Sequence, residues 1–170
     1  GYMATEHAKA FHGLPGVELV GVYSRTMSRA ETLAQQYPGM QVCDSVASLY
    51  EKTRADLVIV TVKELSMREV ALACFQYPWA VLLEKPAGYS LPDAEKIHDA
   101  AIAAHAKVFV ALNRRAYSST RQALGLLNQR QEDKRFVTVL DQQDQVAARD
   151  IYHEPPEVVQ NYMFANSIHL

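Results

Sequence analysis

The strongest constraint on the fold is a regular alternation of short apolar runs with segments of helical length. The run over residues 56–62 is apolar and β-branched and is bounded by polar residues, a pattern typical of a parallel strand covered on both faces. Alternation of such strands with helices predicts a doubly wound parallel α/β sheet. We expect strands over residues 17–23, 40–43, 56–62, 80–83 and 107–112, and helices over 5–11, 45–51, 66–77, 91–106 and 118–128, with a further helix beginning at Ser28.

The chain opens with half of a glycine fingerprint. Gly1 and Ala4 match the back half of the G-x-G-x-x-G/A pattern, which binds a dinucleotide where a strand turns into a helix. Glycine lets the backbone approach a pyrophosphate closely, and the small residue three positions later lets helix and strand pack. For these residues alone, a plain helix start is the alternative. We expect a Rossmann-type sheet that lacks its first strand and its first fingerprint glycine.

Ser24 and Arg25 bear on the choice of cofactor. They follow the strand over residues 17–23, about 20 residues past the glycines, where a dinucleotide-binding unit meets the adenosine ribose. An acid at that position prefers NAD, whereas an arginine accommodates the 2′-phosphate of NADP. The pair therefore predicts NADP over NAD, with a serine cap and a surface arginine as the alternative.

Glu84, Lys85 and Pro86 come directly after the apolar strand over residues 80–83. In open α/β sheets, the carboxyl edge that such a strand reaches is where ligands bind. A partly desolvated lysine can donate or accept a proton near neutrality. Lys85 is therefore our candidate acid/base, and a solvated lysine at a strand end is the alternative.

The regular alternation of strands and helices ends near Arg115. We expect a dinucleotide-binding domain over residues 1–115, followed over residues 116–170 by the beginning of an α+β substrate and dimerisation domain, too short for an independent core. In this second part we predict a strand over residues 136–140 that residues 141–149 extend, a loop over 151–156 and a helix over 157–166.

Composition excludes several classes of function. The formal net charge is −2 and no basic stripe is visible, which argues against nucleic acid as a partner. No apolar run has the length of a membrane span, and no signal peptide is visible. Cys43 and Cys74 lie in apolar contexts and are predicted to be buried free thiols of a reducing, cytoplasmic compartment. The six histidines show no ligand spacing, so no metal site is predicted.

The chain resembles the glucose–fructose oxidoreductase, inositol dehydrogenase and rhizopine catabolism (Gfo/Idh/MocA) family of NAD(P)-dependent oxidoreductases. The resemblance covers essentially the whole chain and is strongest over residues 1–115. The segments that carry it are Gly1-Tyr2-Met3-Ala4 with His7, Glu84-Lys85-Pro86, Asn113-Arg114-Arg115 and the terminal Ile168-His169-Leu170.

The resemblance implies a role for each matching residue. Gly1, Tyr2 and Met3 would lie against the cofactor pyrophosphate. The adenosine ribose would meet Ser24 and Arg25, and Thr61 would lie along the cofactor near the ribose. Glu84 and Lys85 would approach the nicotinamide, with Lys85 close to the substrate hydroxyl. Asn113 and Arg115 would shape the pocket where two domains meet, and His169 would open a His-x-x-Asp motif that assists proton transfer.

The chain departs from the family pattern in two places. The acid and the later histidine of the His-x-x-Asp motif are not present, because the sequence ends one residue after His169. The loop after the strand over residues 56–62 lacks the proline and histidine that the family often has there. This departure puts the geometry of the cofactor-side loop in doubt, and not the fold.

The resemblance implies hydride transfer between a nicotinamide and a CH–OH group of a sugar, cyclitol or sugar-derived small molecule. The full-length protein would be a homo-oligomer, and the 170-residue chain would be an incomplete, inactive piece of it. The alternatives are a cofactor-binding pseudoenzyme or regulator without turnover and, less favoured, a Rossmann-like methyltransferase, which has no need of a strand-end Glu-Lys-Pro.

Overall fold

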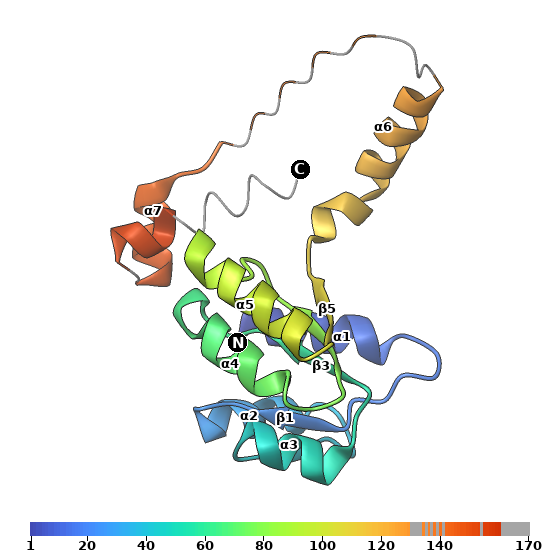
Figure 1. Cartoon of the computed structure of the whole chain (residues 1–170), viewed down its shortest axis with the longest axis vertical. Helices are drawn as coiled ribbons and strands as arrows, with labels where there is room; N and C mark the ends of the chain where they lie inside the picture. Colours follow the sequence, from blue (N-terminus) through green and yellow to red (C-terminus); the bar gives the residue numbers. More distant parts are fainter. Residues whose placement is uncertain are drawn as a thin grey trace. The chain divides into compact units, whose positions relative to one another are not determined.

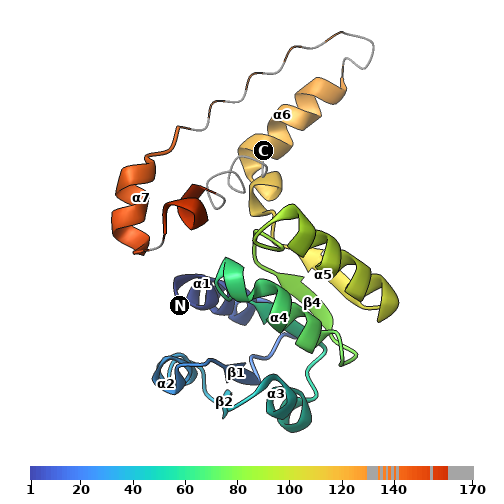
Figure 2. The same cartoon turned by 60° about the vertical axis from the view of Figure 1, so that its left-hand side comes forward.

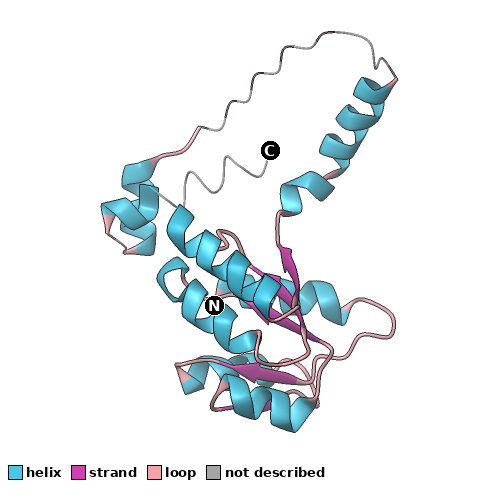
Figure 3. Ribbon diagram, viewed as in Figure 1, coloured by secondary structure: helices cyan, strands magenta, loops and turns pink. Residues whose placement is uncertain are grey.

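The computed structural model describes residues 1–129, 134, 136, 138, 140, 142–153 and 155–160. The chain divides into two compact units, Gly1–Phe109 and Val110–Leu170. Figure 1 follows the chain from the first unit to the second, and Figure 3 separates its helices from its strands.

Strands and helices alternate through the first unit, as the sequence predicts. The strands have three or four residues each; β4 has the predicted bounds, and the others are shorter than expected because residues that flank them are not part of the ladders. The elements, in chain order, are α1 (Tyr2–His12), β1 (Gly21–Tyr23), α2 (Met27–Ala34), β2 (Gln41–Cys43), α3 (Val46–Thr53), β3 (Leu57–Val60), α4 (Glu64–Cys74), β4 (Ala80–Leu83), α5 (Leu91–Ala103) and β5 (Lys107–Val110).

Within the described residues, the strands form two sheets and not one continuous sheet. One contains β1 and β2, and the other has the order β3-β4-β5. The pairing of β1 with β2 is parallel, and so is that of β3 with β4, where Leu57 faces Ala80 and Val60 faces Leu83. The carboxyl ends of β3 and β4 therefore lie at the same edge, where Thr61 and Glu84 follow.

Helices cover the sheets from two sides. Figure 2 shows α1 and α2 on one side and α3, α4 and α5 on the other, which is a doubly wound arrangement. Both α2 and α3 pack against the β1–β2 sheet, and α4 packs beside α5. The helices thus leave the strand ends free to carry a site, as in other open α/β sheets.

The core of the first unit lies between α4, α5 and the strands β3 and β4. Met67, Ala71 and Cys74 are buried on α4, and their spacing places them on one face of the helix. Val81 and Leu83 of β4 are both fully buried, as residues two apart on one face of a strand are expected to be. Burial of each large side chain stabilises the unit by about 1.5–3 kcal/mol.

The second unit contains a short 3₁₀ helix, η1 (Asn113–Ala116), followed by α6 (Ser118–Asn128) and α7 (Gln145–Tyr152). The prediction of α6 is confirmed to the residue. Residues 156–160 are also helical, in agreement with the expected last helix, whose remainder lies outside the described residues. The predicted loop over residues 151–156 overlaps the end of α7.

The prediction of a strand over residues 136–140 is wrong at the positions that the structure describes. Phe136, Thr138 and Leu140 are described, and none of them is in a strand. The expected extension over residues 141–149 is replaced in large part by α7. Asp144 begins this helix, because its Oδ1 accepts hydrogen bonds of 3.0 Å from the backbone N–H groups of Val146 and Ala147, which is the role of an N-cap.

No helix in the described part of the chain is long and apolar enough to cross a membrane.

Candidate active site

The candidate site is built on the turn that follows β4. The backbone N–H of Glu84 donates to Val60 O at 2.9 Å, so the ladder with β3 continues one step past the strand. Glu84 is 7% exposed and is the only buried charged residue in the part of the chain that the structure describes. Strand β4 therefore delivers a carboxylate into the protein interior and the partly buried Lys85 directly after it.

Each oxygen of the Glu84 carboxylate has a partner. Oε2 accepts the backbone N–H of Lys85 at 2.8 Å, and Oε1 lies 3.0 Å from Nε2 of His7 on α1. The side chains of His7 and Glu84 are 16% and 9% exposed. A buried charge needs such partners because it has lost its hydration. The pair ties the middle of α1 to the turn that carries Lys85.

The role of His7 was missed by reasoning from the sequence. His7 is one of the residues that carry the resemblance, but the resemblance assigns it no function. Helical spacing places it on the same face as Ala4 and Phe11, and both of these residues are partly buried, which indicates that His7 faces inward. Nothing in the spacing identifies a partner 77 positions away in the sequence.

A tight turn supports Lys85 from the other side. The Lys85–Pro86 peptide bond is cis, and Gly88 N–H donates to Pro86 O at 2.9 Å. Gly88 has φ +124°, and a Cβ added to it would lie 2.7 Å from the backbone N of Ala94 in α5. The turn therefore packs directly on the first turn of α5. Ser90 occupies the N-cap position of this helix, but its side chain makes no capping hydrogen bond.

The start of α1 offers open backbone. Gly1 has no side chain, and no atom lies within 4 Å of the point where its Cβ would be. Tyr2 and Met3 follow it in the first turn and are 77% and 36% exposed. The first N–H groups of a helix have no partner within the helix and favour an anion. The three residues predicted to meet a pyrophosphate are therefore accessible to one.

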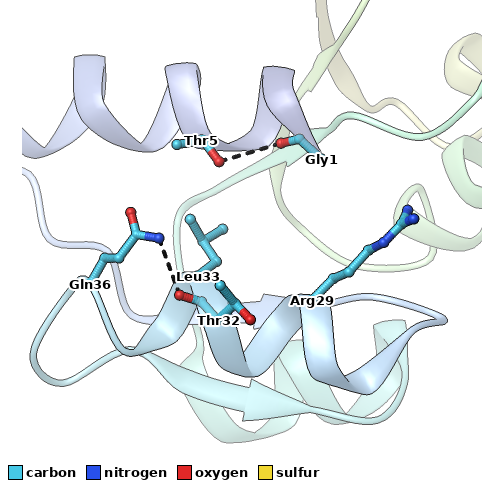
Figure 4. Close-up of a pocket in the computed structure, with 6 residues that line it drawn as sticks. All are labelled: Gly1, Thr5, Arg29, Thr32, Leu33 and Gln36. Atoms are coloured by element: carbon cyan, nitrogen blue, oxygen red, sulfur yellow. Dashed lines mark hydrogen bonds between the residues drawn. The ribbon is translucent and has the colours of Figure 1, made fainter. Parts of the chain in front are cut away.

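An open pocket of about 240 Å³ lies between α1 and α2 (Figure 4). Figure 4 shows Thr5 hydrogen-bonded to Gly1 on one side and Gln36 hydrogen-bonded to Thr32 on the other. The guanidinium of Arg29 adds a positive charge to the lining. Arg29 was not predicted as a site residue, although its place one turn after Arg25 was a signal that could have identified it. The lining residues are Gly1, Thr5, Arg29, Thr32, Leu33 and Gln36.

Ser24 and Arg25 lie at the carboxyl end of β1. Ser24 Oγ accepts the backbone N–H of Thr26 at 3.2 Å. The exposed Arg25 donates from Nη2 to Ser66 Oγ at 3.1 Å, so its guanidinium reaches from β1 to α4. Thr61 follows β3 and is partly buried. Each of these residues lies just past the end of a parallel strand, which is the expected place for a ligand contact.

The remaining predicted residues lie outside the first unit. Asn113 and Arg115 are exposed on η1, in the second unit. His169 lies outside the described residues. The structure thus brings together Glu84 and Lys85, and adds His7 to them.

A family model described as "Oxidoreductase family, NAD-binding Rossmann fold" matches residues 1–112. No sequence among the curated proteins matches the chain. Solved structures match it in fold, and the three described next are 19–22% identical to it in sequence.

Three of these structures hold nicotinamide cofactors. Myo-inositol dehydrogenase from Lactobacillus casei, in complex with NAD(H) and myo-inositol, has a TM-score of 0.71 at 22% identity, over 76% of this chain and 39% of its own. An oxidoreductase from Agrobacterium radiobacter, with NAD⁺, L-tartaric acid and magnesium, has a TM-score of 0.70 at 19% identity, over 76% and 38%. A 3-ketoreductase from Actinomadura kijaniata, with NADP and TDP-benzene, has a TM-score of 0.63 at 21% identity, over 71% and 37%. The chain spans less than half the length of each.

Proposed function

The chain belongs to the GFO_IDH_MocA family of oxidoreductases, whose model describes an NAD-binding Rossmann fold, and on this premise we propose that it carries the cofactor-binding part of a dehydrogenase or reductase acting on CH–OH groups. The substrate class that we propose is a sugar, a cyclitol or a sugar-derived small molecule. One observation carries the proposal: a buried carboxylate at the end of β4 fixes Lys85 at the ligand-binding edge and is bonded to the helix that begins at Gly1.

The residues present fit a nicotinamide dinucleotide. The open backbone of Gly1, Tyr2 and Met3 at the start of α1 suits a pyrophosphate. Arg25 and Arg29 provide positive charge near the ends of β1 and α1. In our proposal Thr61 lies along the cofactor, and Glu84 lies toward the nicotinamide, which supplies the hydride acceptor or donor when bound. Asn113, Arg115 and His169 are proposed to complete the substrate side, with His169 assisting proton transfer.

Lys85 is the proposed acid/base. When an alcohol is oxidised to a carbonyl, its carbon loses a hydride and its oxygen loses a proton. Lys85 Nζ accepts that proton, and in the reverse direction it donates one to the new hydroxyl. The Glu84 carboxylate holds the Lys85 backbone N–H at 2.8 Å, which fixes the point from which the lysine side chain extends. Alignment of this kind is a large part of what a protein contributes to hydride transfer.

The test of the function is hydride transfer by the full-length protein with a panel of polyols and sugars. We expect oxidation of at least one of them with NADP or NAD, and Lys85→Ala should lower kcat by about 10²–10⁴-fold. Lys96→Ala removes an exposed lysine of α5 and should leave kcat unchanged. Binding of cofactor without turnover of any polyol would instead favour the regulator alternative, and full activity in Lys85→Ala would remove the lysine from the mechanism.

We further propose that the protein prefers NADP to NAD. The support is the cationic end of β1, where no carboxylate follows the strand and Arg25 reaches across to Ser66. Charge-assisted hydrogen bonds from a guanidinium to a phosphate contribute about 1.5–3 kcal/mol. Arg25→Ala should therefore weaken NADP binding by about 10–100-fold and leave NAD binding nearly unchanged, as titration calorimetry can measure.

The control for the NADP test is Lys52→Ala, which removes one positive charge from the exposed end of α3. It should change neither affinity. Tighter binding of NAD than of NADP by the unmodified protein would reverse the assignment.

A further inference from the structure

We propose that His7 is a positioning residue that sets the location of Lys85 relative to the cofactor-binding end of α1, and that it acts through Glu84. The inference rests on the proposed function of the same site. It assigns to His7 a task that the proposed function does not require, and it starts from the contact between His7 Nε2 and Glu84 Oε1 at 3.0 Å.

The first step is that the two oxygens of the Glu84 carboxylate contact two different segments of the chain. Oε2 holds the backbone of Lys85, and Oε1 contacts His7. With Glu84 ionised, both oxygens accept, so Nε2 of His7 carries the proton that it shares with the carboxylate. Without His7, Oε1 would be left buried without a partner that the structure shows. A carboxylate in that position rotates or draws in water, and either change moves the hydrogen bond to Lys85.

The second step concerns the other contacts of α1, which include the ring of His12 packed edge-on against Tyr37 at 5.2 Å. Ala8 is its only buried residue, and every residue of this helix is described. Its ion pair between Lys9 and Glu6 joins two residues of the same helix at its exposed surface. The contact of His7 with Glu84 is therefore a polar tie from the middle of α1 to the turn that carries Lys85.

The third step is geometric. His7 follows Gly1 by six residues, which is about 9 Å along a helix. The first two turns of α1 thus connect the proposed pyrophosphate position at Gly1 to the Glu84 turn. On its other side, the turn is fixed on α5 by the close approach of Gly88 to Ala94. The hydrogen bond of His7 to Glu84 is thus a direct link between the element that starts at the proposed pyrophosphate position and the turn that carries Lys85.

The test compares His7→Ala with His7→Gln in the full-length protein. Glutamine carries an N–H donor at a reach similar to that of histidine Nε2, so it can restore the contact with Glu84, whereas alanine cannot. A misplacement of about 1 Å can cost a factor of 10² in turnover. We expect kcat to fall by about 10–100-fold in His7→Ala with a smaller change in KM, and to recover most of its value in His7→Gln.

A second readout does not depend on activity or on a bound cofactor. The Lys85 amide hydrogen is bonded to Glu84 Oε2, and its exchange with solvent can be followed by NMR. We expect exchange about tenfold faster in His7→Ala, the equivalent of one weakened hydrogen bond, and near-normal exchange in His7→Gln. Lys9→Ala, on the exposed face of the same helix, should change neither kcat nor this exchange.

The outcomes separate the inference from the proposed function. Failure of the unmodified protein to transfer a hydride to any substrate would overturn the function, and the Lys85 exchange would still test the role of His7. Unchanged exchange at Lys85 in His7→Ala would overturn the inference, even in an active enzyme. An equal loss of kcat in His7→Gln and His7→Ala would also contradict it. Should His7→Ala fail to fold, His7→Leu, which fills the space but offers no N–H donor, gives the same comparison, with faster exchange at Lys85 expected.

Discussion

Gly88 shows how a single residue supports the candidate site. Its φ of +124° is a conformation that residues with a Cβ rarely adopt, and its missing side chain leaves room for the backbone of Ala94. The turn between Glu84 and α5 can be this short only because both conditions are met at one position. The location of Lys85 therefore depends on a glycine that takes no part in any chemistry.

Gly88→Ala should destabilise the protein by about 2 kcal/mol or more, because it adds backbone strain to a clash with main-chain atoms that cannot move aside. Chemical denaturation measures the change. The matched control is Gly125→Ala on α6, where an added Cβ meets no atom within 4 Å, and which should stabilise the helix by about 0.5–1 kcal/mol. Equal stability of Gly88→Ala and the unmodified protein would show that the turn can relax.

Glu84 and Lys85 show which features of the site can be predicted from the sequence and which cannot. Glu84 and Lys85 were placed at a strand end because a run of apolar residues stops directly before them, and the structure has β4 end at Leu83. The burial of Glu84 and its contact with His7 depend on how two distant segments pack. Periodicity carries no information on such a pairing.

At the scale of elements, the alternation of strands and helices in the first unit was predictable and the second unit was only partly so. Burial on both faces imposes continuous apolar runs on parallel strands, and β4 and α6 match the predicted bounds. The apolar and β-branched residues over 136–140 give the same local signal, but of the described positions in this range Phe136 and Leu140 are 95% and 90% exposed and none is in a strand. Local propensity is a weak guide where no partner strand is at hand.

Helix α7 forms where the sequence predicts the extension of a strand, and its N-cap explains the difference. The polar segment that contains it was expected to extend a strand. Asp144 instead accepts two backbone N–H groups at 3.0 Å, and a cap of this kind contributes about 1 kcal/mol to helix stability. His153 ends the helix in a left-handed conformation. An aspartate before a run of helix-compatible residues was the better predictor here.

At the scale of the whole first unit, one apolar cluster joins β3, β4, α4 and α5. Cys74 lies inside it and is 1% exposed. Burial raises the pKa of the Cys74 thiol from 9.0 to about 12, because the thiolate would be deprived of water. The folded unit therefore holds this thiol neutral over a pH range in which the unfolded chain ionises it, and the stability of the whole unit becomes linked to pH.

The sign of this linkage follows from the two pKa values. Below pH 9 the thiol is neutral in both states and contributes no pH dependence. Above pH 9 the unfolded chain gains stability by losing the proton, while the folded chain retains it up to about pH 12. Folding stability should therefore fall by about 1.4 kcal/mol between pH 8 and pH 10 from this group alone.

Urea denaturation at pH 8 and pH 10 isolates the contribution when the unmodified protein is compared with Cys74→Ala, which lacks the thiol but retains every other group that titrates. The loss between the two pH values should be about 1.4 kcal/mol smaller in Cys74→Ala. Val81→Ala opens space in the same cluster and should lower stability equally at both pH values, which separates packing from ionisation. Parallel pH profiles for Cys74→Ala and the unmodified protein would mean that water reaches the thiol in the folded state.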